Sequence, residues 1–443
     1  MIELRLALQY VPLGCFYGFL YTALPVLLRA GGAESAAVGL LGLLALPTGI
    51  AFFWAPLIDR GARAPAAAAA RHRRWIIVTQ VLAAAALAVV AAVDPAAVDP
   101  GGGDPGGVGG LDRSLYLIVL ALLFVISILF ATKEVAANAL LREMAAGSPG
   151  LMARANGLRA AALFLGTWIG SGMLTGWYEV IGWRDAFLIT AGLGILMLPA
   201  MIGLGACGSR QARGPATGAQ AGEEGLDGAF AALGHMLRHA GGRRRMAGLS
   251  IVAVPLALPV AMFPVFLADA GLTMERIGLV LGGGGTIASL AAAWGTGRLA
   301  ARFGVGRVMV TLIAGQIAAL AVWTGFALAA GRGLAVDGTA LAALGVVQLS
   351  AYAGFTVILN ILAMERARTT HAGTDIAVLR GSFYLTATAA HMAGGWLADP
   401  LGWPGYFGLT TLIFVLVLPL LRLADPSACR RPAGRPVASG AVD

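Results

Sequence analysis

Runs of apolar residues, each about twenty long, recur along nearly the whole chain. A helix of that length, at ~1.5 Å per residue, crosses the ~30 Å hydrocarbon layer of a bilayer. The predicted spans are residues 6–28, 36–58, 75–93, 114–141, 155–178, 184–206, 247–268, 276–297, 307–330, 339–364, 373–397 and 404–423. The pattern therefore predicts an all-α membrane protein with twelve transmembrane helices.

The charged residues are few and unevenly placed. Of the 443 residues, 58% are hydrophobic and 12% are charged, and that charged share is about half the share in a soluble domain. With the amino terminus inside the cell, 23 arginines fall in inner segments and five in outer ones. This bias predicts that both termini are cytoplasmic. It also explains the net charge of +9 by membrane topology, so we expect no nucleic-acid partner.

The spans form two groups of six joined by a polar segment. We expect an N-terminal half over 1–206, a cytoplasmic linker over 207–246, a C-terminal half over 247–424 and a cytoplasmic tail over 425–443. Leu226, Phe230, Leu233 and Leu237 predict an amphipathic helix in the linker. Residues 94–112, rich in Gly, Pro and Asp, predict an external loop. The three cysteines lie far apart without metal-ligand spacing, so we expect neither a disulfide framework nor a metal centre.

The two halves are related by an internal repeat. The matching segments are 24–41 with 263–280, and 176–187 with 395–407. Gly32 falls opposite Gly271, and Gly182 falls opposite Gly402. Two parallel repeats of six spans are the arrangement of the major facilitator halves. The repeat therefore predicts a major facilitator fold, with substrate bound near the midplane between the halves.

One span carries two charges near its middle. Lys133, the only lysine in the chain, precedes Arg142 by nine residues and so lies about 13 Å deeper. A charge there costs about 2.5–3.5 kcal/mol, so neither Lys133 nor Glu134 is expected to face lipid. Glu134 and Asn138 share a helix face, and Lys133 is about 100° around the helix from Glu134. These residues predict a substrate or proton site, with structural pairing of the two charges as the alternative.

Further polar residues form stripes at helical spacing on spans expected to line a central cavity. They are Tyr17 and Tyr21 on the first span, Tyr352, Thr356 and Asn360 on the tenth, and Arg380, Tyr384, Thr388 and His391 on the eleventh. Such tyrosine stripes either pack in the protein interior or form a substrate-binding surface, and the sequence leaves both alternatives open. Arg159 and Arg380 either bind an anion or pair with helix-end carbonyls and with Asp375 and Glu143.

A short motif after the second span predicts a gating element. APLIDRGAR (55–63) resembles the major facilitator loop pattern G-x-L-a-D-R-x-G-R, and GRLAARFG (297–304) is its counterpart in the second half. An acid and an arginine at a helix end can form a charge-assisted latch with a neighbouring helix dipole. The residues that we assign to gating are Asp59, Arg60, Arg302, Arg159 and Asp375.

The resemblance narrows in two further segments. Residues 24–60 resemble the siderophore permeases of the rhizobactin/pyochelin importer type, which are close to the muropeptide permeases and acetyl-CoA transporters. HAGTD (371–375) is similar to the siderophore branch. ATKEVAANA (131–139) falls where that group shows a pattern like A-T-Q-D-I-x-x-D, so Lys133 replaces the amide, Glu134 the aspartate and Asn138 the second acid.

The resemblance implies a proton-coupled secondary transporter that imports a siderophore–iron chelate or a similar amphiphilic solute by alternating access. Tyrosines would contact its rings, Lys133 and the arginines its anionic oxygens, and Glu134 is the first candidate for the coupling proton. A muropeptide permease and a drug or metabolite efflux pump remain alternatives, and a membrane enzyme or receptor is less favoured. The Ala-, Gly- and Arg-rich usage indicates a bacterial inner membrane. We expect a monomer without a cofactor, although its substrate can carry ferric iron, and with protons and the bilayer as partners.

Overall fold

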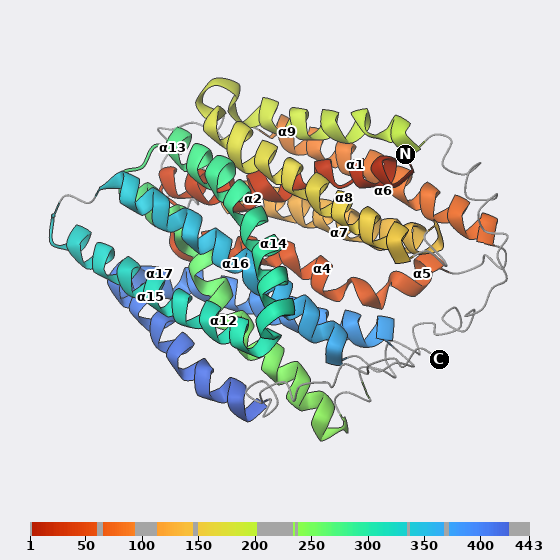
Figure 1. Cartoon of the computed structure of the whole chain (residues 1–443). Coiled ribbons are helices and arrows are strands. Elements are labelled where there is room, and N and C mark those ends of the chain that lie inside the picture. The colour runs from red at the N-terminus through yellow and green to blue at the C-terminus, as the bar shows by residue number, and fades with distance from the viewer. Residues whose placement is uncertain are drawn as a thin grey trace, which may run out of the picture.

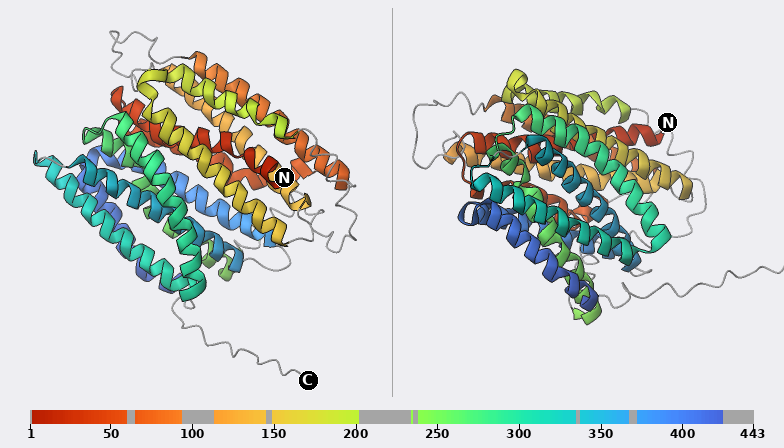
Figure 2. Two further views of the ribbon diagram at one scale, coloured as in Figure 1. Left: turned by 45° about the horizontal axis from the view of Figure 1, so that its top comes forward. Right: turned by 60° about the vertical axis from the view of Figure 1, so that its left-hand side comes forward.

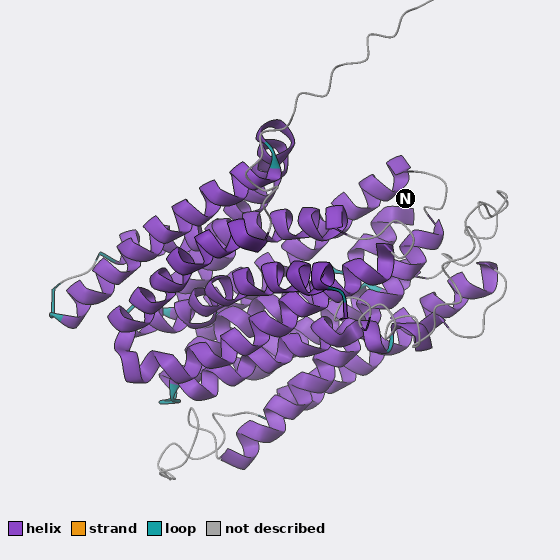
Figure 3. Cartoon of the chain, turned by 90° about the horizontal axis from the view of Figure 1, so that it is seen from below, coloured by secondary structure: helices purple, strands orange, loops and turns teal. Residues whose placement is uncertain are grey.

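The structure consists of packed helices. The computed structural model describes residues 2–59, 65–93, 113–144, 149–201, 234, 238–334, 337–366 and 372–424. Within these residues all regular secondary structure is helical, and short loops join the helices (Figure 3). The all-α architecture predicted from the apolar runs is therefore confirmed.

The helices of the first half (residues 2–201) are α1 (Ile2–Leu8), α2 (Val11–Ala30), α3 (Ser35–Gly39), η1 (Leu40–Ala45), α4 (Leu46–Ile50), η2 (Ala51–Phe53), α5 (Ala55–Asp59), α6 (Pro65–Ala92), α7 (Arg113–Met144), α8 (Pro149–Thr167), η4 (Trp168–Leu174), α9 (Tyr178–Leu196) and η5 (Leu198–Met201). Those of the second half (residues 238–424) are α12 (Ala240–Asp269), α13 (Met274–Gly278), η6 (Leu279–Gly285), α14 (Thr286–Phe303), α15 (Val305–Gly331), α16 (Gly338–Arg366) and α17 (Ala372–Ala424). The segments η4 and η6 are π-helical turns, whereas η1, η2 and η5 are 3-10 helices.

The twelve predicted spans are helical where they are described, apart from turns or bends at residues 9–10, 54, 93, 177 and 197. Nine helical stretches of the described residues are long and apolar enough to cross a membrane. The second and fifth spans are not among the nine. The second is divided into short α and 3-10 segments around Pro47, and the fifth passes from α8 into η4 at Trp168. The eleventh and twelfth spans run together as α17, with a kink at Gly402. The predicted loop 94–112, the amphipathic segment 226–237 and the tail 425–443 lie outside the described residues, apart from Gly234.

The glycines paired by the sequence repeat share an unusual backbone conformation. Gly32 and Gly271 have φ of 86° and 88°, and Gly182 and Gly402 have φ of 69° and 60°. Glycine adopts positive φ without the steric penalty that a Cβ would impose. The same turns therefore recur at matching places in the two halves, which agrees with two parallel six-helix pseudo-repeats.

The two halves approach each other at one end and diverge at the other. Helices α8 and α14 lie close together near η4 and η6 and separate toward Pro149 and Phe303 (Figures 1 and 2). The near end carries Arg29 and Asp399, which are 3.6 Å apart, and we call it the Asp399 end. The opposite end carries Glu3 and Arg154, and we call it the Arg154 end.

Candidate functional site

An aromatic wall lies where the first span meets the eleventh. Tyr17 and Tyr21 of α2 stack with their ring centroids 5.9 Å apart, and the Tyr21 ring lies 5.9 Å from that of His391 on α17. The Tyr17 hydroxyl is 3.3 Å from the hydroxyl of Thr48 on α4. The Tyr21 hydroxyl oxygen is buried and has no hydrogen-bond partner among the described residues. The wall thus combines flat apolar surface with a polar atom that is available to a ligand.

The second half adds two more tyrosines and an arginine to this wall. Tyr384 of α17 lies near Tyr21 and near Tyr352 of α16. The Arg380 guanidinium carbon lies 5.9 Å from the Tyr384 ring centroid. Tyr384 also packs closely on α4, since a Cβ at Gly49 would lie 3.2 Å from the Tyr384 Cβ. The structure therefore brings the predicted stripes of the first, tenth and eleventh spans together.

Glu134 and Asn138 continue the same surface on α7. The Asn138 side-chain oxygen accepts hydrogen bonds from the Tyr10 hydroxyl, at 3.1 Å, and from the Arg159 guanidinium. The Arg159 guanidinium carbon lies 5.1 Å from the Tyr10 ring centroid. Glu134 lies near Tyr10 and Arg380, but it has no hydrogen bond or ion pair with any described residue. We call this group the central cluster. Its members are Tyr17, Tyr21, Tyr352, Tyr384 and His391 of the aromatic wall, together with Glu134, Asn138, Arg159 and Arg380.

Lys133 lies away from this cluster, inside the first half. Its side chain is 2% exposed, and its amine donates to the Gln9 carbonyl at 2.9 Å and to the Gln80 side-chain oxygen at 2.6 Å. The amine also lies 4.6 Å from the Phe130 ring centroid. No ion pair joins Lys133 to Glu134 among the described residues. The structure therefore separates the two neighbouring charges, with one packed in the bundle and the other on the central cluster.

The Gln9 carbonyl bound by Lys133 has a structural role of its own. It lies in the break between α1 and α2, shortly before Pro12. Proline has no backbone N–H, and its ring clashes with the preceding turn, so the helix is interrupted there. The next residue, Tyr10, reaches Asn138 in the central cluster. Lys133 thus satisfies a carbonyl at the break that positions Tyr10.

No described contact joins the remaining predicted site residues to the central cluster. Thr356 donates to the Ala353 carbonyl and Asn360 to the Thr356 carbonyl, so both bond within α16. Arg302 is exposed on α14, with its guanidinium carbon 5.2 Å from the Phe303 ring centroid. The side chains of Asp59 and Asp375, and Arg60 as a whole, lie outside the described residues.

The Asp399 end carries an ion-pair cluster that the sequence did not predict. Arg29 binds both carboxylate oxygens of Asp269 at 3.0 Å and approaches Asp399 at 3.6 Å. The Asp399 carboxylate also accepts from the Ser35 backbone amide at 2.8 Å and from its hydroxyl at 2.6 Å. The Trp403 indole donates to Asp269 at 3.1 Å. Because Arg29 and Ser35 belong to the first half and the other three to the second, we call this group the end latch.

Glycines allow the backbones of the two halves to touch beside the end latch. A Cβ at Gly39 would lie 2.9 Å from the Cα of Gly395, and a Cβ at Gly278 would lie 2.5 Å from the amide nitrogen of Gly176. Real Cβ atoms do not approach backbone so closely, so larger residues would force the helices apart. The Asp399 end is therefore closed by direct helix contact as well as by ion pairs.

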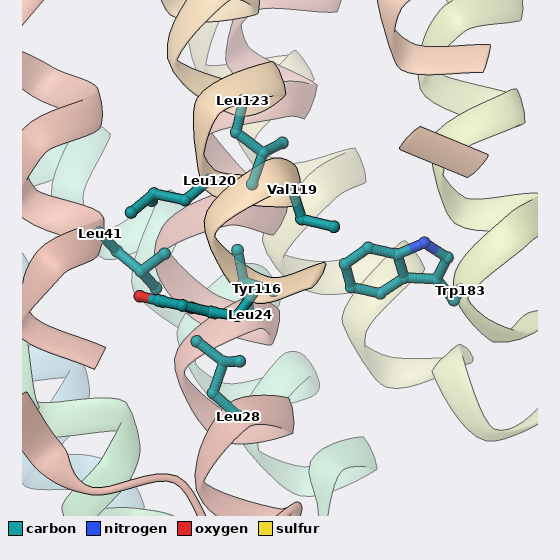
Figure 4. A pocket seen from close by; sticks show the side chains of 8 residues that line it. All are labelled: Leu24, Leu28, Leu41, Tyr116, Val119, Leu120, Leu123 and Trp183. Carbon is teal, nitrogen blue, oxygen red and sulfur yellow. The ribbon is translucent and has the colours of Figure 1, made fainter. Parts of the chain in front are cut away.

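A small apolar pocket near this end does not belong to the candidate site. Its lining residues all come from the first half: Leu24, Leu28, Leu41, Tyr116, Val119, Leu120, Leu123 and Trp183 (Figure 4). The pocket has no charged lining residue, so it has no group to orient a polar solute. Among the described residues, no three His, Cys, Asp or Glu side chains are placed to hold a metal ion.

The fold matches solved structures of transporters, whereas no protein-family model matches the sequence. The nucleoside transporter NupG aligns with a TM-score of 0.64 at 14% identity, over 96% of this chain and 98% of that one. A bacterial homologue of the iron transporter ferroportin, in an inward-facing state, aligns with a TM-score of 0.62 at 13% identity, over 97% of this chain and 99% of that one. These matches extend over nearly the full length of each chain. The chain therefore has the major facilitator fold that its sequence repeat predicts.

Proposed function

We propose that the protein is a secondary transporter that works by alternating access, with the central cluster as its substrate site. The observation that carries the proposal is a polar, aromatic surface built by both halves. Tyr17, Tyr21, Glu134 and Arg159 come from the first half, and Tyr352, Arg380, Tyr384 and His391 from the second. A rocking motion of one half against the other would open this surface to each side of the membrane in turn.

The two ends of the molecule support the same mechanism. The end latch and the glycine contacts hold the halves together at the Asp399 end, while α8 and α14 separate toward the Arg154 end (Figure 2). A carrier that is closed at one end and open at the other has this asymmetry. If both termini are cytoplasmic, as the arginine bias predicts, the closed end faces outward and the structure is an inward-facing conformer.

The substrate class that we propose is a siderophore–iron chelate or a similar amphiphilic solute, imported with protons across a bacterial inner membrane. Stacked tyrosines suit flat rings. Glu134 is partly buried and has no ion-pair partner among the described side chains, which suits a proton carrier. The structurally similar proteins move different cargo, nucleosides for NupG and iron for ferroportin, so the shared fold does not choose a substrate. Muropeptide import and drug efflux remain the competing assignments within the same mechanism.

Transport measurements in membrane vesicles test this proposal. Vesicles containing the protein should accumulate an iron-loaded aryl siderophore when the interior is alkaline, and Glu134→Gln should abolish accumulation. Glu179→Gln, which alters an exposed carboxylate on α9, is the matched control and should leave accumulation intact. Extrusion driven by the same gradient would reverse the proposed direction. A protein that moves no siderophore, muropeptide or drug under any gradient would not be a carrier of these solutes.

A further inference from the structure

The central cluster contains three charged side chains, Glu134, Arg159 and Arg380, that form no ion pair with another described side chain. Arg159 donates to the neutral side chain of Asn138, and Arg380 lies against the Tyr384 ring. Glu134 has no hydrogen bond with a described residue. The ion pairs between described side chains involve Arg29 and Arg154, which lie at the two ends of the molecule. In the part of the chain that the structure describes, the cluster therefore combines two arginines with one carboxylate.

Such an excess of positive charge is costly inside a membrane protein. An unpaired charge within a membrane span raises the free energy, unless water or a partner compensates it. Within the cluster, Glu134 can offset only one of the two arginines. Lys133 cannot relieve the excess, because it is itself basic and faces Gln9 and Gln80 in the interior of the first half.

The neighbours of the arginines show what kind of ligand fits. Arg159 is contributed by α8 of the first half and Arg380 by α17 of the second, so an anion bound by both would bridge the halves. The stacked rings of Tyr17 and Tyr21, with His391 beside them, offer a flat surface to an aromatic group. The buried hydroxyl of Tyr21, which bonds to no described residue, can donate to an oxygen on that group.

We propose that the central cluster binds an organic anion in which an aromatic ring carries or adjoins the negative group. Arg159 and Arg380 bind the negative group, and the ring packs on Tyr17 and Tyr21. The inference rests on the proposed function in one respect, which is that the central cluster is the substrate site. It assigns the negative group of the ligand to Arg159 and Arg380 together, two residues for which the sequence left anion binding and structural pairing open, and it excludes Lys133 from that role.

Binding of three ligands that share a ring and differ in charge tests the inference. Salicylate is the anionic probe, salicylamide the neutral one and hydroxybenzylamine the cationic one, each titrated calorimetrically into the full chain purified in detergent. Salicylate should bind at least about tenfold more tightly than either of the others. Arg380→Gln should weaken salicylate binding by about 10- to 100-fold and leave salicylamide binding unchanged.

Two further variants keep the result interpretable. Arg159→Lys retains the charge and should bind salicylate more tightly than Arg159→Gln, which separates a charge effect from misfolding. Arg332→Gln, at an exposed turn after α15, is the matched control and should bind salicylate as the unmodified protein does. Equal binding of the three probes, a preference for the amine, or no binding of any probe would each overturn the inference. The proposed transport cycle is tested separately by distances between the halves, which require no ligand.

Discussion

Replacing Lys133 with methionine should destabilise the first half without removing a substrate contact. Methionine fills a similar volume but leaves two buried acceptors, the Gln9 carbonyl and the Gln80 side-chain oxygen, without their donor. An unsatisfied buried acceptor costs about 1–3 kcal/mol, so Lys133→Met should lower the free energy of unfolding by about 2–6 kcal/mol. Arginine is too large for this site, where the lysine is 2% exposed, and should destabilise it as well.

A double-mutant cycle with Gln80→Leu isolates the part of this loss that the side-chain pair causes. In the double mutant, Gln80 no longer presents a buried oxygen, so only the Gln9 carbonyl remains unsatisfied. The double mutant should therefore be more stable than the sum of the single effects predicts, by about 1–2 kcal/mol. Glu134→Gln is the control, because Glu134 makes no hydrogen bond with a described residue, and it should change stability by less than about 0.5 kcal/mol.

Equilibrium unfolding by SDS in mixed micelles suits this measurement, because heating often unfolds membrane proteins irreversibly. Protease protection of the folded fraction would provide a second, independent reading. A Lys133→Met protein as stable as the unmodified one, beside a Glu134→Gln protein that unfolds readily, would refute the placement of these two charges.

The other predictions concern transport and the closed end. Glu134→Gln should still exchange substrate across vesicle membranes but fail to concentrate it, and accumulation at the unmodified rate would remove Glu134 from the coupling role. Asp399→Asn weakens the end latch, and the loss of about 1 kcal/mol should raise the open population at that end roughly fivefold. The change should appear as faster thiol labelling of a cysteine placed at Val38, which is buried beside Gly39, and unchanged labelling would contradict it. Gly39→Val should block closure against Gly395 and trap that end open. Gly192→Val is the control and should not, because a Cβ at Gly192 would have no neighbouring heavy atom within 4 Å. Equal labelling rates in the two variants would exclude a closing role for Gly39.

The sequence predicted the features that depend on local pattern. Apolar length gave the spans, and the repeat paired Gly32 with Gly271 and Gly182 with Gly402 because each must form the same turn in both halves. Helical spacing also placed Glu134 and Asn138 on one face. Helical spacing does not show which face of the helix meets the substrate. The sequence therefore predicted one site for Lys133, Glu134 and Asn138, although Lys133 points into the bundle.

The end latch was missed for a different physical reason. Arg29, Asp269 and Asp399 lie in three separate helices, α2, α12 and α17, and each resembles an ordinary interfacial charge in the sequence. Only the packing of the halves brings Asp269 to Arg29 and Asp399 to Ser35. A weak signal was available, since the repeat places Asp269 opposite Ala30, the residue after Arg29. Predicted gating through Asp59, Arg60 and Asp375 stays a prediction, because their side chains are not described.

Paired distance measurements between the halves test alternating access most directly. Spin labels at Ala30 and Leu401 report on the Asp399 end, and labels at Arg154 and Arg302 report on the Arg154 end; all four positions are exposed. The labelled proteins need Cys15, Cys207 and Cys429 replaced, and each pair is measured with and without Asp399→Asn in the same membranes. The account predicts that weakening the end latch lengthens the Ala30–Leu401 distance and shortens the Arg154–Arg302 distance. If the two distances lengthen together, or if the first changes while the second stays fixed, the halves do not rock about a central site.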